Sequence, residues 1–298
     1  MAKLMECIPN ISEGRRKDVV EAVVDEVRGV AGVALLDYSS DESHNRSVIT
    51  FAGEPVAVME AAFKVAKKAA ELIDLTVHTG EHPRMGAVDV IPFVPIRDMD
   101  MAECVELSKQ LAKRIADEID LPVFLYEESA SAPHRKNLAA VRKGQFEGMA
   151  KKVEEEKWHP DFGDNRIHPT AGVVAVGARQ PLIAFNINLS TSDVEVANKI
   201  AKIIRESGGG LRAVKAMGVL LEDRNVAQVS INMCNFRQTP LYRVFELVKV
   251  EAARYGVSVI GSEIIGLTPM DALADTADYY LKIENFDKHR QVLENHLL

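Results

Sequence analysis

The segment H-T-G-E-H-P-R-M-G-A-V-D at positions 78–89 places two histidines, a glutamate and an arginine within seven positions. Its two glycines and its proline are incompatible with a helix, so we expect a loop. Pro83 restricts the backbone of His82 to extended geometry, which fixes the position of the imidazole. A fixed imidazole with Glu81 and Arg84 in the same turn suits proton transfer to and from a substrate. The simpler alternative is a solvated loop with a surface histidine.

Three further polar clusters lie next to apolar runs, where functional groups often stand. Asn10 lies in P-N-I-S-E-G after the first apolar run, and Asn45 and Arg46 lie in S-H-N-R before a later one. The segment F-G-D-N-R-I-H-P-T-A-G at 162–172 has the glycines and polar residues of a loop that wraps a flat ligand. The simpler alternatives are a turn with a helix cap, a hairpin tip with a solvated arginine, and an interdomain linker.

Several common kinds of site are not indicated by the sequence. His78 and His82 are four positions apart, but the glycine between them and the proline after them break the helix that a metal-binding pair needs. The sequence has no G-x-G-x-x-G after a strand, no P-loop and no G-x-S-x-G. Its three cysteines include no C-x-x-C pair, and Cys7 lies in an apolar run where a core role is expected. We therefore expect neither a metal site nor a disulfide framework.

The apolar periodicity predicts the elements that must position these clusters. Pro92 and Pro95 indicate that the run 88–96 is an edge strand or a bent strand. The expected strands are 4–8, 33–36, 47–52, 88–96, 121–126, 171–176, 182–189, 214–221, 226–233 and 257–260, and the expected helices are 16–30, 55–73, 101–119, 193–207, 239–255 and 271–280.

The order of these elements repeats along the chain. Each half begins with a strand that ends in a similar turn, I-P-N-I-S-E-G early and F-N-I-N-L-S-T later, and continues with helix, strand, turn, strand, helix and strand. This order is typical of the split β-α-β, ferredoxin-like arrangement, although such echoes also arise by chance. We predict an α+β fold of two ferredoxin-like α/β sandwich subdomains, residues 1–180 and 181–298. Helices are expected on one face of each sheet, with a ligand cleft between the subdomains.

The composition narrows the class of protein. The chain has 298 residues, of which 47% are hydrophobic, and a formal net charge of -8 with a pI of about 5.6. This acidic balance argues against a nucleic-acid-binding protein. No signal peptide and no window of 18 apolar residues is visible, so we expect no membrane association. These features predict a soluble cytoplasmic protein, with a homodimer as the default assembly.

Four motifs carry a resemblance to a known family. M-E-C-I-P-N-I-S-E-G, H-N-R-S-V-I-T-F-A-G, H-T-G-E-H-P-R-M-G-A-V-D-V-I-P-F-V-P and L-I-A-F-N-I-N-L follow in this order, and E-H-P-R-M-G-A-x-D is highly specific. In these motifs the sequence resembles the formiminotransferase family, which includes the N-terminal half of the bifunctional formimidoyltransferase-cyclodeaminases. Because the sequence stops at Leu298, it resembles the transferase part without the cyclodeaminase half.

The resemblance implies two α/β subdomains that bind tetrahydrofolate as co-substrate in the cleft, with His82 as the catalytic residue. The family often has a second acid two positions after L-L-D, where this sequence has Ser39, and Asp41 is the alternative. The implied folate contacts are Gly163, Asp164, Asn165, Arg166, Ile167, His168, Pro169, Thr170, Ala171 and Gly172.

The implied reaction moves the formimidoyl group (HC=NH) from N-formimidoyl-L-glutamate to nitrogen 5 of tetrahydrofolate, a step of histidine degradation and one-carbon metabolism. One group that titrates near neutrality, such as His82, can take the proton from the incoming nitrogen and return it to the departing one. Arginines suit the carboxylates of both substrates, asparagines suit the pterin edge or the amidine, and a glutamate can orient the histidine. The expected substrate-binding residues are Asn10, Asn45, Arg46, Glu81, Arg84 and Asn188.

Two other functions fit the same sequence. Formyl transfer between N-formylglutamate and tetrahydrofolate would use the same histidine, because the sequence does not discriminate C=NH from C=O. A non-catalytic folate-binding module would need the loops but not a titrating histidine. A pH–rate profile separates the enzyme from the binding module.

Overall fold

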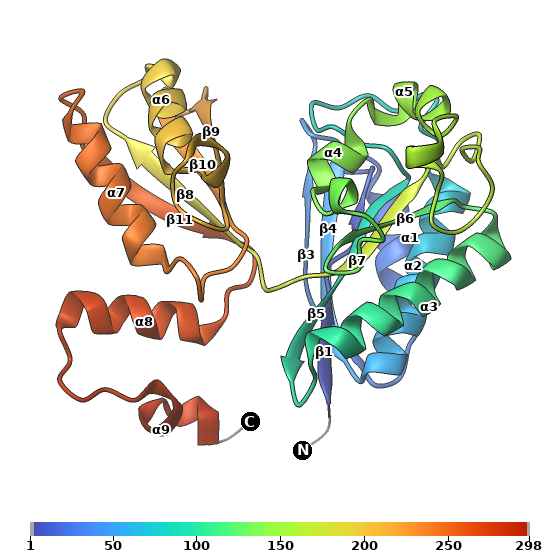
Figure 1. The fold of residues 1–298 in the computed structure, drawn as a ribbon, viewed down its shortest axis with the longest axis horizontal. Coiled ribbons are helices and arrows are strands. Elements are labelled where there is room, and N and C mark those ends of the chain that lie inside the picture. Colours follow the sequence, from blue (N-terminus) through green and yellow to red (C-terminus); the bar gives the residue numbers. More distant parts are fainter. Residues whose placement is uncertain (1–2, 297–298) are drawn as a thin grey trace. The chain divides into compact units, whose positions relative to one another are not determined.

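Two separate β-sheets, each with its own helices and hydrophobic core, divide the chain into unit 1, Met1–Arg179, and unit 2, Gln180–Leu298 (Figure 1). The computed structural model describes residues 3–296. Two units of mixed helix and sheet confirm the predicted α+β fold with two subdomains. Within residues 3–296, no helix is both long and apolar enough to cross a membrane.

The sheet of unit 1 contains a ferredoxin-like core and an extension. β4 pairs with β3 on one side and with β1 and β2 on the other, and β5 pairs with β1 and β2. β7 and β6 then continue the sheet in parallel beside β5. The strands are β1 (Leu4–Cys7), β2 (Asn10–Ile11), β3 (Val33–Asp41), β4 (Arg46–Gly53), β5 (Val88–Arg97), β6 (Val123–Glu127) and β7 (Val174–Ala178).

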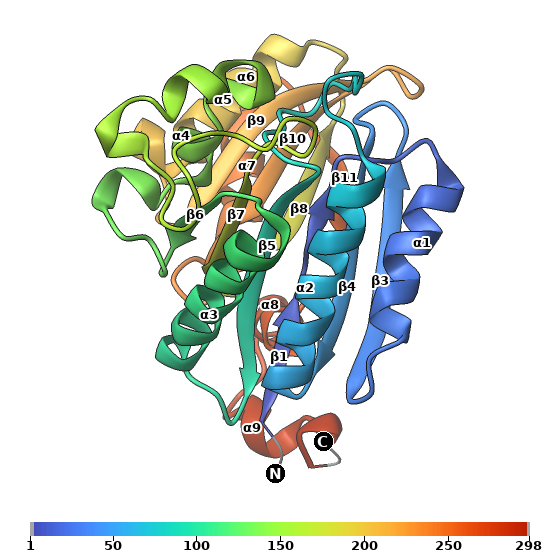
Figure 2. The same cartoon turned by 90° about the vertical axis from the view of Figure 1, so that its right-hand side faces the viewer.

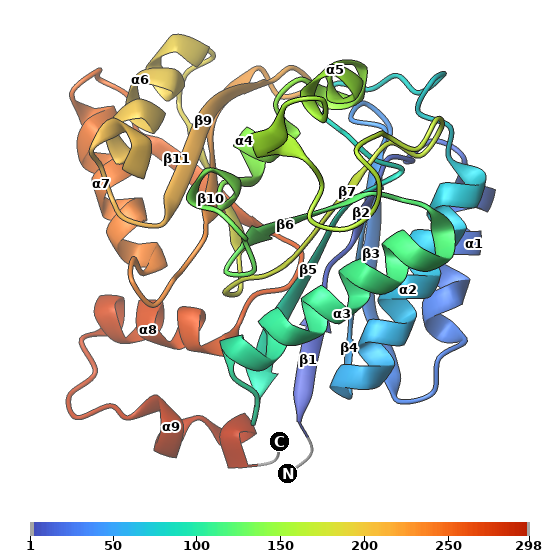
Figure 3. The same cartoon turned by 45° about the vertical axis from the view of Figure 1, so that its right-hand side comes forward.

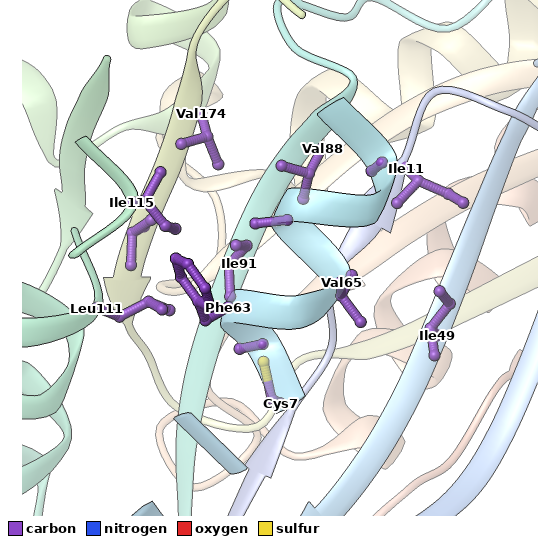
Figure 4. Packing of buried hydrophobic residues seen from close by; sticks show 14 of the residues in the cluster. Cys7, Ile11, Ile49, Phe63, Val65, Val88, Ile91, Leu111, Ile115 and Val174 are labelled. Carbon is purple, nitrogen blue, oxygen red and sulfur yellow. The ribbon is translucent and has the colours of Figure 1, made fainter. Parts of the chain in front are cut away.

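Three long helices cover one face of this sheet, where they lie side by side (Figure 2). Phe63 of the second helix and Leu111 of the third meet Ile91 of β5 in the main core of unit 1 (Figure 4). Asp100 and Glu103 form a capping box that starts the third helix at the predicted position. The helices are α1 (Lys17–Arg28), α2 (Pro55–Leu72) and α3 (Met101–Ile119).

A smaller helical layer packs on the opposite face of the same sheet, over β6 and β7 (Figure 3). Val141 and Met149 from this layer cover Phe124 and Tyr126 of β6. The expectation of helices on one face only is therefore wrong for unit 1, because a few apolar side chains in a polar segment suffice to bury two aromatic rings. The elements of this segment are η1 (Pro133–Arg135), α4 (Leu138–Arg142), α5 (Gln145–Lys152) and η2 (Glu156–Trp158).

β5 is a central strand, so of the two alternatives predicted for 88–96, an edge strand or a bent strand, the edge strand is wrong. Pro92 has no N–H to donate, but it lies opposite the interruption at Pro9 that separates β1 from β2. Its carbonyl still accepts a hydrogen bond from the Ile8 N–H at 3.4 Å. A proline is tolerated in a central strand here because the neighbouring ladder is already broken at that point.

Unit 2 has the ferredoxin-like connectivity without an extension, with an antiparallel sheet in the order β11-β8-β10-β9. Phe185 and Ile187 point into the core under the helices, so Asn186 and Asn188, which alternate with them, lie on the other face. The strands are β8 (Ile183–Leu189), β9 (Val214–Leu221), β10 (Val226–Met233) and β11 (Val259–Ile265). The helices are α6 (Val194–Ile204), η3 (Glu206–Gly208), α7 (Leu241–Ala253), α8 (Met270–Leu281), α9 (Lys288–Gln291) and η4 (Leu293–His296).

Candidate functional site

His82 lies in the loop between α2 and β5 with its ring half-buried. Its Nδ1 is 2.7 Å from the carbonyl oxygen of Pro83. Since a carbonyl only accepts hydrogen bonds, Nδ1 carries the proton and Nε2 keeps the lone pair. The His44 ring stands edge-on with its centroid 6.1 Å away. Nε2 is therefore the atom of His82 that can accept a proton from a substrate.

Asp89, the last residue of the 78–89 motif, is fully buried at the start of β5 and holds two arginines. Its Oδ2 accepts hydrogen bonds from Arg46 Nη1 at 3.0 Å and from Arg142 Nη2 at 2.7 Å. Its Oδ1 accepts one from the Met85 N–H at 2.9 Å, which ties the carboxylate to the loop that carries His82. One carboxylate between two guanidinium groups leaves a surplus positive charge.

The pKa of Asp89 reflects this arrangement. Burial raises the pKa of its carboxyl, but the charges of Arg142 and Arg46 and the Met85 N–H outweigh burial and bring the pKa below its ordinary value. Asp89 is therefore ionised, and both arginines have a fixed counter-charge.

Arg46 is held by a second partner as well. Its Nε and Nη2 donate to Oδ1 of Asn10 at 3.2 and 2.8 Å, and Asn10 Nδ2 donates to the Ile8 carbonyl at 2.9 Å. Asn10 on β2 and Arg46 on β4 are brought together because these two strands pair directly. The structure thus joins two predicted substrate-binding residues, 36 positions apart, in one network with Asp89.

The pKa of His82 is lowered to about 4. Burial is the largest cause, followed by the positive charges of Arg46 and Arg142, while Asp89 and the Pro83 carbonyl act in the opposite direction. We expected a group that titrates near neutrality, and the structure instead keeps this imidazole neutral at pH 7. The unprotonated imidazole of His82 can accept a proton, and its protonated form is a stronger acid than an ordinary imidazolium.

Arg84 is turned away from this cluster. Its Nη1 and Nη2 donate to the two carboxylate oxygens of Glu147 at 2.8 and 2.6 Å, and its Nε donates to Nδ1 of His78 at 3.2 Å. This bidentate pair fastens α5 to the loop. Glu81 is exposed, and its backbone N–H donates to the Ser43 carbonyl at 3.2 Å.

Asn45 connects the loop to the first turn of the chain. Its Oδ1 accepts from the Gly14 N–H and its Nδ2 donates to the Thr79 carbonyl, both at 2.9 Å. Its own carbonyl oxygen lies 3.0 Å from Nε2 of His78. Both ends of this amide are therefore engaged with the backbone on either side of it.

The segment 163–172 lies beside the chain that follows His82. Gly86 and Gly172 form an antiparallel bridge, and the Ala87 N–H donates to the Ala171 carbonyl at 2.9 Å. Gly172 has a φ of +71°, and a Cβ there would lie 2.2 Å from the Met85 carbonyl oxygen. Only glycine allows this approach. The structure thus brings the predicted folate loop and the predicted catalytic loop together.

Within this loop, backbone and side-chain bonds define the shape. The His168 N–H donates to the Gly172 carbonyl at 2.9 Å, and Nδ1 of His168 accepts from the Ala171 N–H at 3.0 Å. Arg166 is exposed and donates to Asp120 at 2.7 Å and to Asp164 at 3.1 Å. Hydrogen bonds therefore hold the tip in a fixed turn, and the guanidinium of Arg166 donates to two acids.

Asn188 belongs to a separate network in unit 2. Its Oδ1 accepts from Nε2 of Gln228 on β10 at 2.8 Å. The same nitrogen lies 2.9 Å from Oε1 of Glu263 on β11, and Nδ2 of Asn186 donates to that oxygen at 3.2 Å. Sequence reasoning missed Asp89, Gln228 and Glu263. The available signal was a polar residue inside a strand pattern, such as V-D-V-I or V-A-Q-V.

His82 is not a lining residue of either of two cavities. One of about 420 Å³ in unit 2 is bounded by α7, α8 and β11, with Tyr242, Phe245 and Tyr280 among its lining residues. The other, about 290 Å³ in unit 1, is lined in part by Glu13 and His78. In residues 3–296, no group of three His, Cys, Asp or Glu side chains is arranged to hold a metal ion.

The fold and this site define a class: an α+β protein of two ferredoxin-like units, with a neutral imidazole base in the field of a cationic cluster that suits anionic substrates. The sequence comparisons specify it further. Residues 4–179 match the formiminotransferase domain, N-terminal subdomain, and residues 184–296 match the formiminotransferase domain. The chain belongs to the formiminotransferase domain family, and the resemblance seen in its motifs is confirmed.

Known proteins match this sequence over its whole length. Glutamate formimidoyltransferase of Streptococcus pyogenes serotype M1 is 62% identical over 298 residues, 100% of both chains. Glutamate formimidoyltransferase of Thermoplasma acidophilum is 49% identical over 96% of this chain and 94% of its own. Formimidoyltransferase-cyclodeaminase of Mus musculus is 43% identical over 97% of this chain and 55% of its own length.

Proposed function

We propose that this chain transfers the formimidoyl group from N-formimidoyl-L-glutamate to nitrogen 5 of tetrahydrofolate and that His82 moves the proton between the two nitrogens. The single observation that carries this proposal is the state of His82. Its Nε2 is a free base, and two arginines stand within electrostatic reach of it. The transferase names of relatives that match the full chain support the choice of reaction.

In the proposed sequence, nitrogen 5 attacks the carbon of the protonated amidine and forms a tetrahedral carbon that bears both nitrogens. His82 Nε2 then takes the proton from nitrogen 5. The resulting imidazolium gives this proton to the glutamate nitrogen, the bond between that nitrogen and the carbon breaks, and L-glutamate leaves. His82 returns to its neutral form without an external acid or base.

The low pKa of His82 determines which step it helps most. An imidazolium with a pKa of about 4 is a much stronger acid than ordinary histidine, so it protonates the departing amine readily. As a base it is weaker, but the nitrogen that it deprotonates is cationic in the tetrahedral adduct and therefore acidic.

Arg46 and Arg142 suit the carboxylates of the two anionic substrates. The pair is mostly buried, with exposed side-chain fractions of 11% and 14%, and it exceeds the charge of Asp89 by one. A guanidinium binds a carboxylate in bidentate fashion. We assign Arg84 and Asn45 to holding the loop rather than to substrate contact, because their polar ends are already engaged.

Folate contacts are assigned to the loop Gly163–Gly172, which runs beside the His82 loop through Gly86 and Ala87. Asn165 at its exposed tip and the Arg166 guanidinium, released from Asp120 or Asp164, are its polar groups for a ligand. None of the three cysteines, all within residues 3–296, forms a disulfide, which suits a reducing compartment, and we assign the protein to the cytoplasm. The homodimer stays a prediction, which sedimentation equilibrium tests.

The experiment for this proposal is His82→Ala in a coupled assay with both N-formimidoyl-L-glutamate and N-formyl-L-glutamate as donors. We expect the formimidoyl donor to react and the variant to lose roughly 10²–10⁴-fold in kcat, with tetrahydrofolate still bound. His159→Ala is the control, a histidine of unit 1 outside the cluster. Equal rates for His82→Ala and the unaltered protein would remove the assigned role, and reaction of the formyl donor alone would replace the function.

A further inference from the structure

On the sheet face opposite the main core, each unit carries the same three-residue arrangement, and in unit 1 the smaller helical layer covers part of this face. In each unit, a polar side chain on the third strand of the β-α-β-β-α-β repeat donates both to an asparagine on the first strand and to an acid on the fourth. The three equivalent pairs are Asn10 and Asn188 on the first strands, Arg46 and Gln228 on the third, and Asp89 and Glu263 on the fourth.

The distances agree closely between the units. Arg46 lies 2.8 Å from Asn10 Oδ1 and 3.0 Å from Asp89 Oδ2. In the other unit, the corresponding distances from Gln228 Nε2 are 2.8 Å to Asn188 Oδ1 and 2.9 Å to Glu263 Oε1. The two arrangements thus share their strands and distances but not their register, since Asn188 pairs directly with Gln228 whereas Asn10 pairs with Val48.

The charge does not repeat. Asp89 receives two guanidinium groups and is outweighed by them. Glu263 receives only the neutral amides of Gln228 and Asn186, both on Oε1. Among residues 3–296, no donor contacts its other oxygen, Oε2. In this hydrogen-bond network the acid of unit 2 thus has no cationic partner, and one of its oxygens can accept from a ligand.

A half-buried carboxylate of this kind recognises a cation or a polarised N–H donor. Because Oε1 already accepts from two amides, one N–H of an N–C–N group donates to Oε2, and the carboxylate charge favours the cationic or polarised edge of that group. The two amides fix the position of Oε1, so Glu263 presents a pre-oriented acceptor. Its side chain therefore loses little conformational freedom when a ligand binds.

We propose that Glu263, positioned by Asn186 and Gln228, is a binding residue for an N–C–N donor edge, an inference that rests on the proposed function. Both substrates of that function contain such a group. One is the protonated amidine of the formimidoyl donor, and the other is the aminopyrimidinone edge of the pterin. The three side chains of this arrangement are one acid and two neutral amides, a set that suits an N–C–N donor edge.

The test compares Glu263→Gln with Glu222→Gln, a matched change in the exposed turn between β9 and β10. The full chain is used, its folding is checked by circular dichroism, and two quantities are measured. They are the dissociation constant of tetrahydrofolate by calorimetry under anaerobic conditions and the KM of N-formimidoyl-L-glutamate.

Loss of a charge-assisted hydrogen bond weakens binding by roughly 10–100-fold. If the pterin edge is the ligand, Glu263→Gln raises the tetrahydrofolate dissociation constant by this factor and leaves the donor KM unchanged. If the amidine is the ligand, the donor KM rises and tetrahydrofolate binding is retained. Glu222→Gln changes neither.

Values within twofold of the unaltered protein for both ligands would overturn the proposal. If Glu263→Gln does not fold, Glu263→Asp replaces it. This variant keeps the charge, but its shorter side chain holds the carboxylate farther from the ligand, so the same loss of binding is expected. The proposed function fails separately, when the unaltered protein does not transfer the formimidoyl group at all. If the unaltered protein is active and Glu263→Gln binds both ligands normally, only the inference about Glu263 is excluded, and the proposed function stands.

Discussion

The ferredoxin-like cores of unit 1 and unit 2 have the same strand connectivity, but the polar clusters on their sheets differ in the sign of their net charge. The acid of unit 1, Asp89, is buried between Arg46 and Arg142, whereas Glu263 of unit 2 is held by neutral amides. The comparison teaches that the ferredoxin-like scaffold determines where polar side chains meet. We infer that the ligand charge each face accepts depends on whether the third strand carries an arginine or a glutamine.

Asp89→Asn is expected to have the largest effect on stability, since it leaves two mostly buried guanidinium groups without their counter-charge. Breaking a buried ion pair by removing one partner costs about 3–5 kcal/mol. Glu263→Gln retains an acceptor for two neutral donors and should cost at most about 1 kcal/mol. Urea unfolding of both variants measures the difference. Equal losses would mean that the two acids are held in the same way.

Gly172→Ala tests whether the unit 1 site depends on the two loops that meet there. The added Cβ meets the Met85 carbonyl at 2.2 Å and the backbone has a φ of +71°, so we expect a loss of about 1–3 kcal/mol and lower turnover. Gly256→Ala is the matched control in unit 2, with a φ of +68° and open space around it. A similar effect in both variants would indicate backbone strain alone.

Arg142→Met should shift the acid limb of the pH profile of kcat/KM to higher pH. Because the charge of Arg142 helps to hold the pKa of His82 near 4, its removal raises this pKa toward the ordinary 6.5. The free imidazole then becomes protonated at a higher pH and activity falls earlier on acidification. Titration of the His82 ring by NMR gives the pKa directly. Arg28→Met, on the exposed side of α1, should leave the profile in place, and an unmoved limb in Arg142→Met would contradict the assignment.

The smallest effect concerns the pH dependence of stability. His82 has a lower pKa in the folded chain than the 6.5 of the unfolded chain, so the unfolded chain binds more protons between pH 6.5 and 4. The free energy of unfolding should therefore decrease as pH falls through this window. His82→Gln should flatten that slope in urea titrations at pH 7, 5.5 and 4, whereas His159→Gln should not. Parallel slopes for His82→Gln and the unaltered protein would exclude His82 as the source.

Much of the local structure follows from patterns within short segments. The predicted helix 101–119 coincides with α3, and the strands 214–221 and 226–233 coincide with β9 and β10. The prolines at 88–96 predict an edge or a bent strand, but the strand is central, because Pro92 lies opposite the break between β1 and β2. That pairing is a long-range property. The cleft expected between the two subdomains stays a prediction.

The candidate site shows the same division. His82 and the loop 163–172 were singled out because proline, glycine and titratable side chains act on their own backbone, and such local effects are visible in sequence. The sequence does not indicate a functional role for Asp89, because a single acid in an apolar run suggests a site only when its neighbours in space are known.

By itself, the sequence determined the order of the elements, the α+β class and the motifs that carry the family resemblance, because periodicity and turn chemistry depend on residues a few positions apart. Only the tertiary structure decided that Arg46, Asp89 and Arg142 form one cluster and that His82 is neutral at pH 7. These properties arise from strand pairing and burial, which join residues up to 96 positions apart and set the dielectric around them.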